Sequence, residues 1–355
     1  MKTRIEEIKR KQLAELAGYR RKLYQDPKLK YLFLELTLRC NERCLHCGSS
    51  CGEVFSGEMT VEDYRRVLTE VKEDFGTKGY MLCVTGGEPL LRKDFFEIME
   101  IAHSLGFSWG MTSNATLITR ETAHRLSECG MKTISVSIDG LPETHDSFRQ
   151  TPGAYTRAMK GLEALIEEGG FESIQVTTVV NHESIKELPA LYEIMLGLDI
   201  DSWRVIGVEP IGRALLHPEL LLTKEDTRTL FEFIREKRAE DMPVTYGCSH
   251  YLGVEYEHDL RDYYFICCAG IYTASITAGG DIIACLDIER RPETVQGNIY
   301  RDRFSEVWKN RFEFFRRDFS ELSEKCRNCS EKEFCAGGAK HSWDYETNSQ
   351  RVCFF

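Results

Sequence analysis

Apolar runs rich in β-branched and aromatic residues alternate, over the first two thirds of the chain, with segments whose apolar residues recur every three or four positions. The first pattern predicts strands and the second predicts helices. The expected strands are 31–38, 79–85, 107–113, 132–138, 173–180 and 201–207. The expected helices are 60–75, 92–105, 119–129, 154–168, 184–196 and 223–239. The pattern therefore predicts six strand–helix units in succession.

Such repetition favours an α/β fold, because parallel neighbouring strands need a crossover connection that a helix can supply. Six units fit either an open sheet or an incomplete β/α barrel. A charged helical pattern precedes the first strand, and a Cys- and Gly-rich region begins near residue 243. We expect an N-terminal helical extension over 1–30, the α/β domain over 31–242 and a small Cys-rich α+β domain over 243–355.

Charge and hydropathy exclude several classes of partner. The formal net charge of −11 and the pI near 5.5 argue against nucleic acid, since phosphate binding relies on clustered Lys and Arg. The basic stretch at 19–30 is more simply the solvated face of a helix and its linker. No apolar segment reaches the ~18 residues of a membrane span, and the charged start lacks the apolar core of a signal peptide. We expect a cytoplasmic protein without a membrane partner.

Fourteen cysteines in a reducing compartment call for a role other than disulfides. They gather at 40–51, 248–285 and 326–353, and short spacings of this kind are typical of metal binding. Cys83 and Cys129 stand alone and are more simply small buried residues. The cysteine pattern therefore predicts more than one metal centre.

Distinctive segments follow five of the expected strands. They are "RCNERCLHC" (39–47), "TGGEP" (85–89), "TSNAT" (112–116), "SVSIDG" (135–140) and "VVN" (179–181). Each alone could be a turn or an ordinary strand exit. The carboxyl ends of parallel strands share one edge, where α/β folds bind ligands, so five such segments predict a common site.

The first of these segments sets three cysteines, Cys40, Cys44 and Cys47, in a C-x3-C-x2-C spacing. Three thiolates on a four-iron cluster leave one iron free for a small molecule, whereas four would close a zinc or iron-sulfur site. Zinc with Cys51 as fourth ligand is the alternative. It would explain neither the strand-edge segments nor the later cysteines.

"CNERCLHC" followed by "TGGEP" resembles the signature of the radical S-adenosylmethionine (radical SAM) enzymes, and the resemblance covers roughly residues 31–210. It implies a partial (β/α)6 TIM-like barrel. It also implies that the three cysteines hold a 4Fe-4S cluster whose open iron takes S-adenosyl-L-methionine (SAM). Reductive cleavage of SAM would then give methionine and a 5′-deoxyadenosyl radical, so an electron donor of the flavodoxin or ferredoxin type is expected.

The same resemblance assigns roles to residues at the strand ends. Gly86, Gly87 and Glu88 would receive the methionine amine, since a glycine pair permits close approach and a carboxylate suits an ammonium. His46 would lie near the adenine, and Arg149 would pair with the SAM carboxylate. The residues expected to serve the ribose and carboxylate are Ser113, Asn114, Ser137 and Asn181.

The C-terminal third resembles the SPASM extension of this superfamily, which carries auxiliary iron-sulfur clusters. We expect one full cluster on the four cysteines of "CRNCSEKEFCAGGA" and the terminal "RVCFF", namely Cys326, Cys329, Cys335 and Cys353. A zinc ion at these four thiols is the alternative.

A second auxiliary cluster is expected to be incompletely ligated by cysteine. In "CCAGIYTASITAGGDIIAC" the relatives' pattern selects Cys267 over Cys268 as the first ligand, with Cys285 as the next. Relatives read C-x-G-G-C where this chain ends in Ala339, so one thiolate is missing. Cys248 or Cys268 could supply a third, and we expect the set to be Cys248, Cys267 and Cys285.

Relatives with such extensions mostly modify peptides or proteins. The resemblance therefore implies a ribosomal peptide maturase that performs crosslinking, epimerisation or related chemistry on C–H bonds. A radical SAM enzyme of haem- or quinone-type cofactor biosynthesis is the alternative. Sulfatase maturation is disfavoured, because those enzymes carry Asp directly after the cysteine matching Cys285 and this chain has Leu286. A non-catalytic iron-sulfur carrier or zinc module would leave "TGGEP" and Arg149 unexplained.

Overall fold

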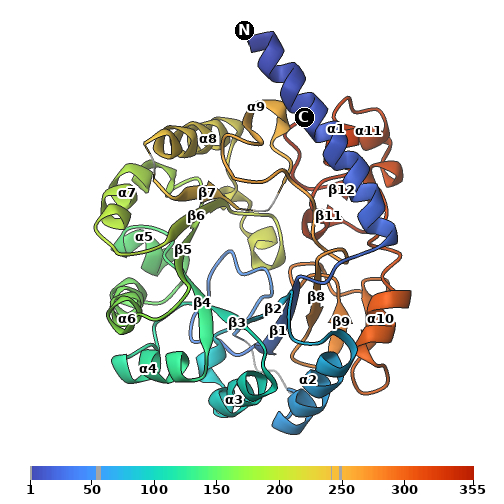
Figure 1. Ribbon diagram of the computed structural model, residues 1–355. Coiled ribbons are helices and arrows are strands. Elements are labelled where there is room, and N and C mark those ends of the chain that lie inside the picture. The colour runs from blue at the N-terminus through green and yellow to red at the C-terminus, as the bar shows by residue number, and fades with distance from the viewer. Residues whose placement is uncertain (1, 53–56, 241, 248–249) are drawn as a thin grey trace.

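The computed structural model describes residues 2–52, 57–240, 242–247 and 250–355. Its main sheet has ten strands in the order β10-β9-β8-β1-β2-β3-β4-β5-β6-β7. The strands β1 to β7 curve around a central space, and the helices that connect them lie outside (Figure 1). The α/β fold class and the partial barrel are thereby confirmed.

All neighbours from β1 to β7 pair in parallel. Six of these strands fall where the apolar runs predict them. These six are β1 (Tyr31–Thr37), β2 (Met81–Gly86), β3 (Trp109–Ser113), β4 (Met131–Ser137), β5 (Ser173–Val180) and β6 (Ser202–Gly207). The seventh strand, β7 (Val244–Tyr246), follows the last predicted helix and is absent from the predicted elements. The carboxyl ends of these parallel strands share one edge, as the expected common site requires.

The outer helices bury their apolar side chains against the sheet, and all but α5 fall where an apolar stripe predicts a helix. They are α2 (Val61–Phe75), α3 (Phe95–Leu105), α4 (Arg120–Glu128), α5 (Pro142–Phe148), α6 (Ala154–Glu168), α7 (Leu188–Leu196) and α8 (Lys224–Ala239). Thr60 and Thr223 begin α2 and α8 with capping boxes that satisfy backbone N–H groups of the first turn. The seven-residue α5 is absent from the predicted elements because two helical turns are too short to show a period.

The C-terminal region extends the barrel sheet on the β1 side. Strand β8 (Thr273–Ile276) pairs in parallel with β1, and β9 (Asp281–Ile283) and β10 (Val295–Asn298) follow in antiparallel order. The remaining elements are α9 (Gly253–Tyr256), α10 (Phe304–Asn310), α11 (Glu324–Arg327), α12 (Lys332–Cys335), β11 (Trp343–Asp344) and β12 (Ser349–Gln350). The expected boundary near 243 stays a prediction, since the sheet runs across it.

The first helix, α1 (Lys2–Gln25), packs against α9 and α12 of the C-terminal region (Figure 1). The Arg20 guanidinium donates to the carbonyl oxygens of Glu333 and Phe334, at 2.6 and 2.8 Å. This helix therefore braces the segment that carries the late cysteines. Among the described helices, none combines the length and the apolar character of a membrane span.

Candidate functional site

The cluster loop, residues 38–52, follows β1 and carries Cys40, Cys44 and Cys47. Its backbone is held from two sides: the N–H of Leu45 donates to the carbonyl of Phe148, and the Arg213 guanidinium donates to the carbonyls of Cys44 and Cys51 at 2.8 and 2.7 Å. Since Phe148 ends α5 and Arg213 lies beyond β6, segments far apart in sequence fix the loop at the barrel mouth.

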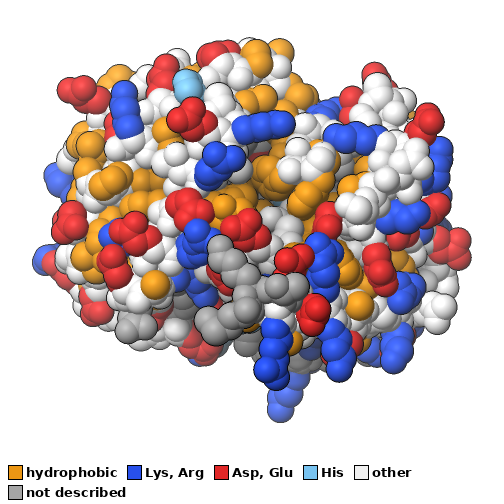
Figure 2. All heavy atoms as spheres, turned by 90° about the horizontal axis from the view of Figure 1, so that it is seen from above, with side chains coloured by type: hydrophobic (Ala, Val, Ile, Leu, Met, Phe, Trp, Pro, Cys, Tyr) orange, Lys and Arg blue, Asp and Glu red, His pale blue; other side chains and the backbone are white. Residues whose placement is uncertain are grey.

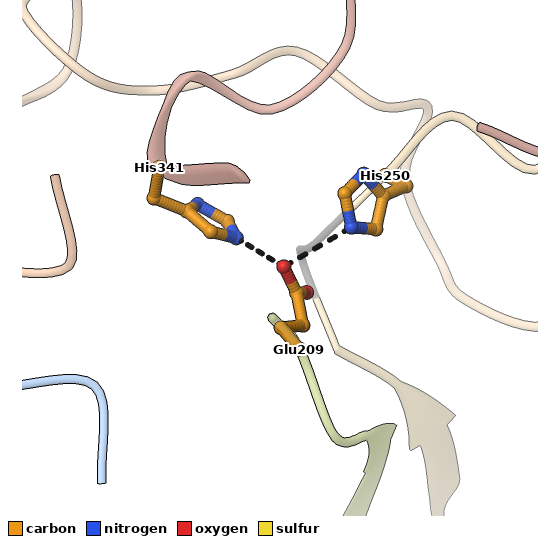
Figure 3. Close-up of side chains that lie close together, drawn as sticks. All are labelled: Glu209, His250 and His341. Carbon is orange, nitrogen blue, oxygen red and sulfur yellow. Dashed lines mark hydrogen bonds and ion pairs between the residues drawn. The ribbon is translucent and has the colours of Figure 1, made fainter. Parts of the chain in front are cut away.

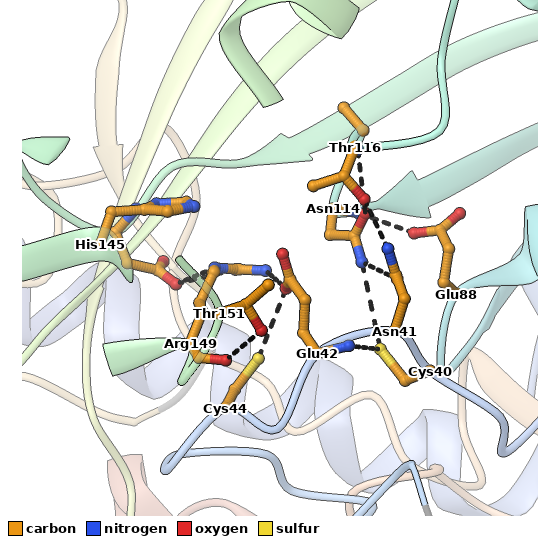
Figure 4. Close-up of polar contacts among 12 residues, drawn as sticks. Cys40, Asn41, Glu42, Cys44, Glu88, Asn114, Thr116, His145, Arg149 and Thr151 are labelled. Carbon is orange, nitrogen blue, oxygen red and sulfur yellow. Dashed lines mark hydrogen bonds and ion pairs between the residues drawn. The ribbon is translucent and has the colours of Figure 1, made fainter. Parts of the chain in front are cut away.

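The sulfurs of this loop are surrounded by hydrogen-bond donors. Cys40 Sγ lies 3.4 Å from the N–H of Glu42 and 4.0 Å from Asn114 Nδ2, and Cys47 Sγ lies 3.3 Å from the N–H of Cys51 (Figure 4). Donors of this kind suit the thiolates that ligate iron. Within the described part of the chain, no three thiols lie within 4.8 Å of one another, the spacing of a single-ion site. The loop therefore fits a cluster better than one zinc ion.

The Cys51 side chain lowers the pKa of the neighbouring Cys47 thiol. A hydrogen bond from the Cys51 side chain lowers the pKa of the Cys47 thiol to about 6 against the opposing effect of burial. The buried Cys51 is thus positioned to donate a hydrogen bond to the sulfur of Cys47, one of the predicted cluster ligands.

Glu88 lies fully buried beside the cluster loop. One of its oxygens accepts from the backbone N–H of Asn114 at 2.9 Å (Figure 4). Both oxygens lie 3.0 Å from Ser113 Oγ. These partners are neutral, and burial raises the pKa of the Glu88 carboxyl to about 7. A buried carboxylate with neutral partners gains most from a cation, so the site fits the predicted ammonium of SAM.

The glycine pair before Glu88 is required by contact with the end of β1. A Cβ on Gly86 would lie 2.2 Å from the carbonyl oxygen of Thr37, and one on Gly87 would lie 2.0 Å from that of Arg39. Gly86 also has a φ of 138°, which side chains rarely adopt. The N–H groups of Gly87 and Glu88 donate to those two carbonyls at 2.8 and 2.9 Å. The glycines therefore place Glu88 against the cluster loop.

Arg149 bridges two buried carboxylates. It donates to Asp139 Oδ2 at 2.8 and 2.7 Å and to Glu42 Oε2 at 2.7 Å (Figure 4). The other oxygen of Glu42 is buried and has no hydrogen-bond partner among the described residues. Arg149 thus fixes the end of α5 to the cluster loop, and its expected contact with the SAM carboxylate stays a prediction.

His46 stacks on Phe148 with the ring centroids 4.1 Å apart. Burial lowers the pKa of His46 to about 4, so the imidazole is neutral at physiological pH. Its Nδ1 is buried without a hydrogen-bond partner among the described residues. A flat neutral ring with one unused polar atom fits the predicted place beside the adenine.

The other predicted SAM residues divide into two groups. Ser113 and Asn114 meet Glu88, and the Asn114 amide also donates to Asn41 Oδ1 at 2.9 Å. Asn181, in contrast, accepts from two backbone N–H groups of its own turn after β5. Ser137 is half-buried at the end of β4. Their expected roles with the ribose and carboxylate stay predictions.

The late cysteines form a second candidate centre. A cavity of about 310 Å³ is lined by all four predicted ligands, Cys326, Cys329, Cys335 and Cys353. The N–H of Glu331 donates to Cys329 Sγ at 3.4 Å. Because these sulfurs also lack the close spacing of a single-ion site, the residues fit an iron-sulfur cluster better than zinc.

One expected ligand of the incomplete cluster, Cys267, lies beside η6 (Lys340–Ser342). Cys267 Sγ accepts from the N–H of Lys340 at 3.4 Å, whereas the Cys268 thiol donates to the carbonyl of Ile266. Ala339, at the position where the SPASM resemblance implies a cysteine, is buried. Cys248 lies outside the described residues, so its expected role as a ligand stays a prediction.

Three residues of the site were not assigned from the sequence. Glu42 and Asp139 flank Arg149, and Arg213 holds the cluster loop. All three occur in segments that the sequence singles out, "CNERC", "SIDG" and "EPIGRA", but their roles depend on contacts between distant segments.

Two family models match the chain. The radical SAM superfamily model covers residues 34–195, and the SPASM iron-sulfur cluster-binding domain covers residues 267–330. These matches agree with the cluster loop and the late cysteines.

Relatives extend the likeness over most of the chain. An AdoMet-dependent heme synthase from Methanosarcina barkeri is 32% identical over 321 residues, which is 85% of this chain and 89% of that protein. The mycofactocin maturase MftC from Mycobacterium tuberculosis is 26% identical over 86% of this chain and 76% of that protein.

Solved structures share the fold. Streptococcus suis SuiB bound to its precursor peptide SuiA has a TM-score of 0.71 at 19% identity, over 92% of this chain and 75% of that chain. Together with the site, these similarities show that the chain belongs to the radical SAM superfamily and is an enzyme that uses SAM, a 4Fe-4S cluster and auxiliary iron-sulfur clusters in a SPASM domain.

Proposed function

We propose that this enzyme modifies a carboxylated tetrapyrrole in haem-type cofactor biosynthesis. The observation that carries the proposal is the 32% identity to an AdoMet-dependent heme synthase over 89% of that protein. A second related protein from M. barkeri, an Fe-coproporphyrin III synthase, is 33% identical over 57% of this chain. The alternative stated from the sequence is therefore better supported than a peptide substrate.

A large cavity supports this substrate class. It has a volume of about 990 Å³ and lies beside residues 207–210 at the end of β6 and Tyr246 at the end of β7. Small-molecule and cofactor sites typically occupy ~300–1,000 Å³. The apolar and aromatic lining includes Val208, Leu230, Phe231, Leu252 and Phe354. Such a cavity is large enough for a flat macrocycle.

Five basic and five acidic side chains accompany the apolar lining. Lys224 and Arg228 lie one turn apart on α8, and Arg351 lies near the C-terminus. The face of the molecule that is seen from above carries hydrophobic side chains across its middle, with acidic and basic side chains around them (Figure 2). An apolar surface with nearby cations suits a ligand that combines an aromatic ring with carboxylates.

The chain's own residues would prepare the reaction. When bound on the cluster, SAM supplies the radical that removes a hydrogen atom from the substrate. Glu88 would hold the SAM amine, and His46 would lie beside its adenine. Arg149 neutralises the two carboxylates that it bridges, so the wall of the site carries less uncompensated charge.

A peptide substrate is the second candidate. The similarity to MftC over 86% of this chain favours it, whereas the likeness to SuiB, at 19% identity, concerns the fold alone. A peptide maturase would use the same radical chemistry, so the two candidates differ in what the cavity accepts.

The test compares both substrate classes under one set of conditions. Anaerobically reconstituted enzyme receives SAM, dithionite and either a carboxylated iron porphyrin or the short peptides encoded beside the gene. Product masses and 5′-deoxyadenosine are then measured. We expect a modified porphyrin and unchanged peptides; a modified peptide with an unchanged porphyrin would replace this proposal with the maturase.

Paired variants test the cavity. Lys224→Ala and Arg228→Ala should raise the KM for the porphyrin, because each removes a cation that can meet a carboxylate. Lys72→Ala, an exposed residue on α2, is the matched control and should leave the KM unchanged.

A further inference from the structure

Three side chains of the kinds that ligate metals meet at a place separate from the two candidate iron-sulfur sites. Glu209 follows β6, His250 precedes α9, and His341 lies in η6 (Figure 3). Glu209 Oε2 is 2.8 Å from Nε2 of His341 and 3.1 Å from Nε2 of His250. The three ligand atoms all lie within 4.8 Å of one another.

The environment of this group favours a ligand. His250 is 4% exposed, and its Nε2 has no hydrogen-bond partner among the described residues although Glu209 is close. A buried polar atom that lacks a good hydrogen bond is unfavourable. That nitrogen points toward the same carboxylate oxygen as His341, so an electron-pair acceptor for its lone pair would have to sit between the three side chains (Figure 3).

We propose that Glu209, His250 and His341 bind one divalent transition-metal ion of the zinc or iron(II) class. Imidazole nitrogens with one carboxylate oxygen are the usual protein ligands of these ions. Two ligands held at ~2.1 Å from an ion lie about 3.4 Å apart in the tetrahedral arrangement usual for zinc and about 3.0 Å apart at the right angles of an octahedral ion. The observed separations of 2.8 and 3.1 Å are close to the right-angle value, and a small outward movement of the side chains would reach the tetrahedral one.

Two iron-containing groups fit these ligands poorly. Cluster ligands bind different iron atoms, whereas these three atoms converge on one point. A porphyrin occupies four positions around its iron and leaves one on each face, so three convergent side chains cannot share it. The proposed site is therefore a separate mononuclear centre, and it does not depend on the proposed substrate.

An ion at this position would have two effects on the protein. It would tie the segment after β6 to η6 of the C-terminal region, next to Lys340, whose N–H meets Cys267 Sγ. Glu209 and His250 also line the cavity of about 990 Å³. Three protein ligands leave coordination positions open, and an oxygen ligand such as water or a carboxylate could occupy them from that cavity.

A charged bridge without metal is the competing explanation. Burial alone would lower the pKa of His341, but Glu209 and Asp287 raise it to about 10. A protonated His341 would then satisfy Glu209 through a hydrogen bond. This bridge explains the contact between Glu209 and His341 but gives Nε2 of His250 only an ion-pair contact at 3.1 Å that lacks the alignment of a hydrogen bond.

The test uses holoenzyme with its iron-sulfur clusters intact. After equilibrium dialysis against micromolar zinc, zinc, iron and sulfide are counted in the same sample, and the zinc site is examined by X-ray absorption. We expect one zinc per chain with nitrogen and oxygen ligands at about 2.0–2.2 Å and no sulfur near ~2.3 Å. Absence of bound zinc, or sulfur ligands around it, would overturn the proposal.

Variants then identify the ligands. His250→Ala and His341→Ala should each weaken zinc binding by about 100-fold or more with iron and sulfide unchanged. Glu209→Gln, which preserves shape, should also weaken it. His124→Ala, an exposed histidine on α4, is the control and should keep the zinc. Unchanged zinc affinity in both histidine variants, or loss of iron together with zinc, would contradict the assignment.

Discussion

Replacing Glu88 by Gln should have two opposite effects, on the stability of the SAM-free protein and on SAM binding. Glu88 is fully buried, and burial raises the pKa of its carboxyl from 4.5 to about 7. A carboxyl group whose pKa is higher in the folded state than in the unfolded state binds its proton more tightly when the protein is folded. The wild-type protein therefore loses stability as the pH rises from the unfolded pKa toward the folded one.

The magnitude follows from the two pKa values. A rise from 4.5 to about 7 corresponds to about 3 kcal/mol above neutral pH and about 2 kcal/mol near pH 6. Gln removes this cost, keeps an acceptor for the N–H of Asn114 and loses the weaker contact with the N–H of Leu90, worth about 1 kcal/mol. We expect Glu88→Gln to raise the free energy of unfolding by about 2 kcal/mol near pH 8.5 and about 1 kcal/mol near pH 6.

SAM binding should change in the other direction. A neutral amide cannot pair with the ammonium of SAM, so affinity should fall by about 1.5–3 kcal/mol, or roughly 10- to 150-fold. Thermal unfolding at the two pH values and SAM titration of the anaerobic enzyme measure the two effects. Glu100→Gln, an exposed carboxyl on α3, is the control and should change neither.

The combination of results decides the role of Glu88. If Glu88→Gln bound SAM as tightly as the wild type, the carboxylate would not be the amine site and "TGGEP" would be only a turn. If its melting temperature rose equally at both pH values, the buried charge would not be the cause of the change.

Two further predictions concern the cluster loop and Arg149. Replacing all three loop cysteines by Ala should remove about one cluster's worth of iron and abolish 5′-deoxyadenosine formation. Cys326→Ala should instead remove iron from the terminal cysteines and leave the iron of the cluster loop in place. Unchanged 5′-deoxyadenosine formation in the triple variant would refute the assignment. Arg149→Ala should lower the free energy of unfolding by about 3–5 kcal/mol, because two buried carboxylates lose their cation. Arg120→Ala, with a side chain 81% exposed, should cost less than about 1 kcal/mol in the same denaturation series, and equal losses in both variants would contradict the buried bridge.

The sequence predicts those elements and motifs whose characteristic pattern lies within a single short segment of the chain. Strands and long helices show their period within one segment, and all six predicted strands are present. The cluster loop and "TGGEP" are also local, since cysteine spacing and a glycine pair report their own backbone geometry. These local features are enough to indicate which edge of the barrel carries the chemistry.

Features that depend on distant contacts could not be predicted in this way. Arg149 and Glu42 lie 107 positions apart, and no spacing rule joins them. The group of Glu209, His250 and His341 comes from three segments, so none of its members stands out in its own neighbourhood. The terminal cysteines, which line one cavity, could be grouped from the sequence because three of them share a short motif. No such motif supplies the missing ligand of the incomplete cluster predicted at Cys267 and Cys285.

Transfer of a labelled hydrogen tests the proposed reaction most directly. An iron porphyrin deuterated on its carboxyalkyl side chains is incubated anaerobically with reconstituted enzyme, SAM and dithionite, and the 5′-deoxyadenosine is analysed by mass spectrometry. If the radical attacks this substrate class, deuterium appears in 5′-deoxyadenosine and the porphyrin changes mass. Formation of unlabelled 5′-deoxyadenosine beside an unchanged porphyrin would contradict the proposal.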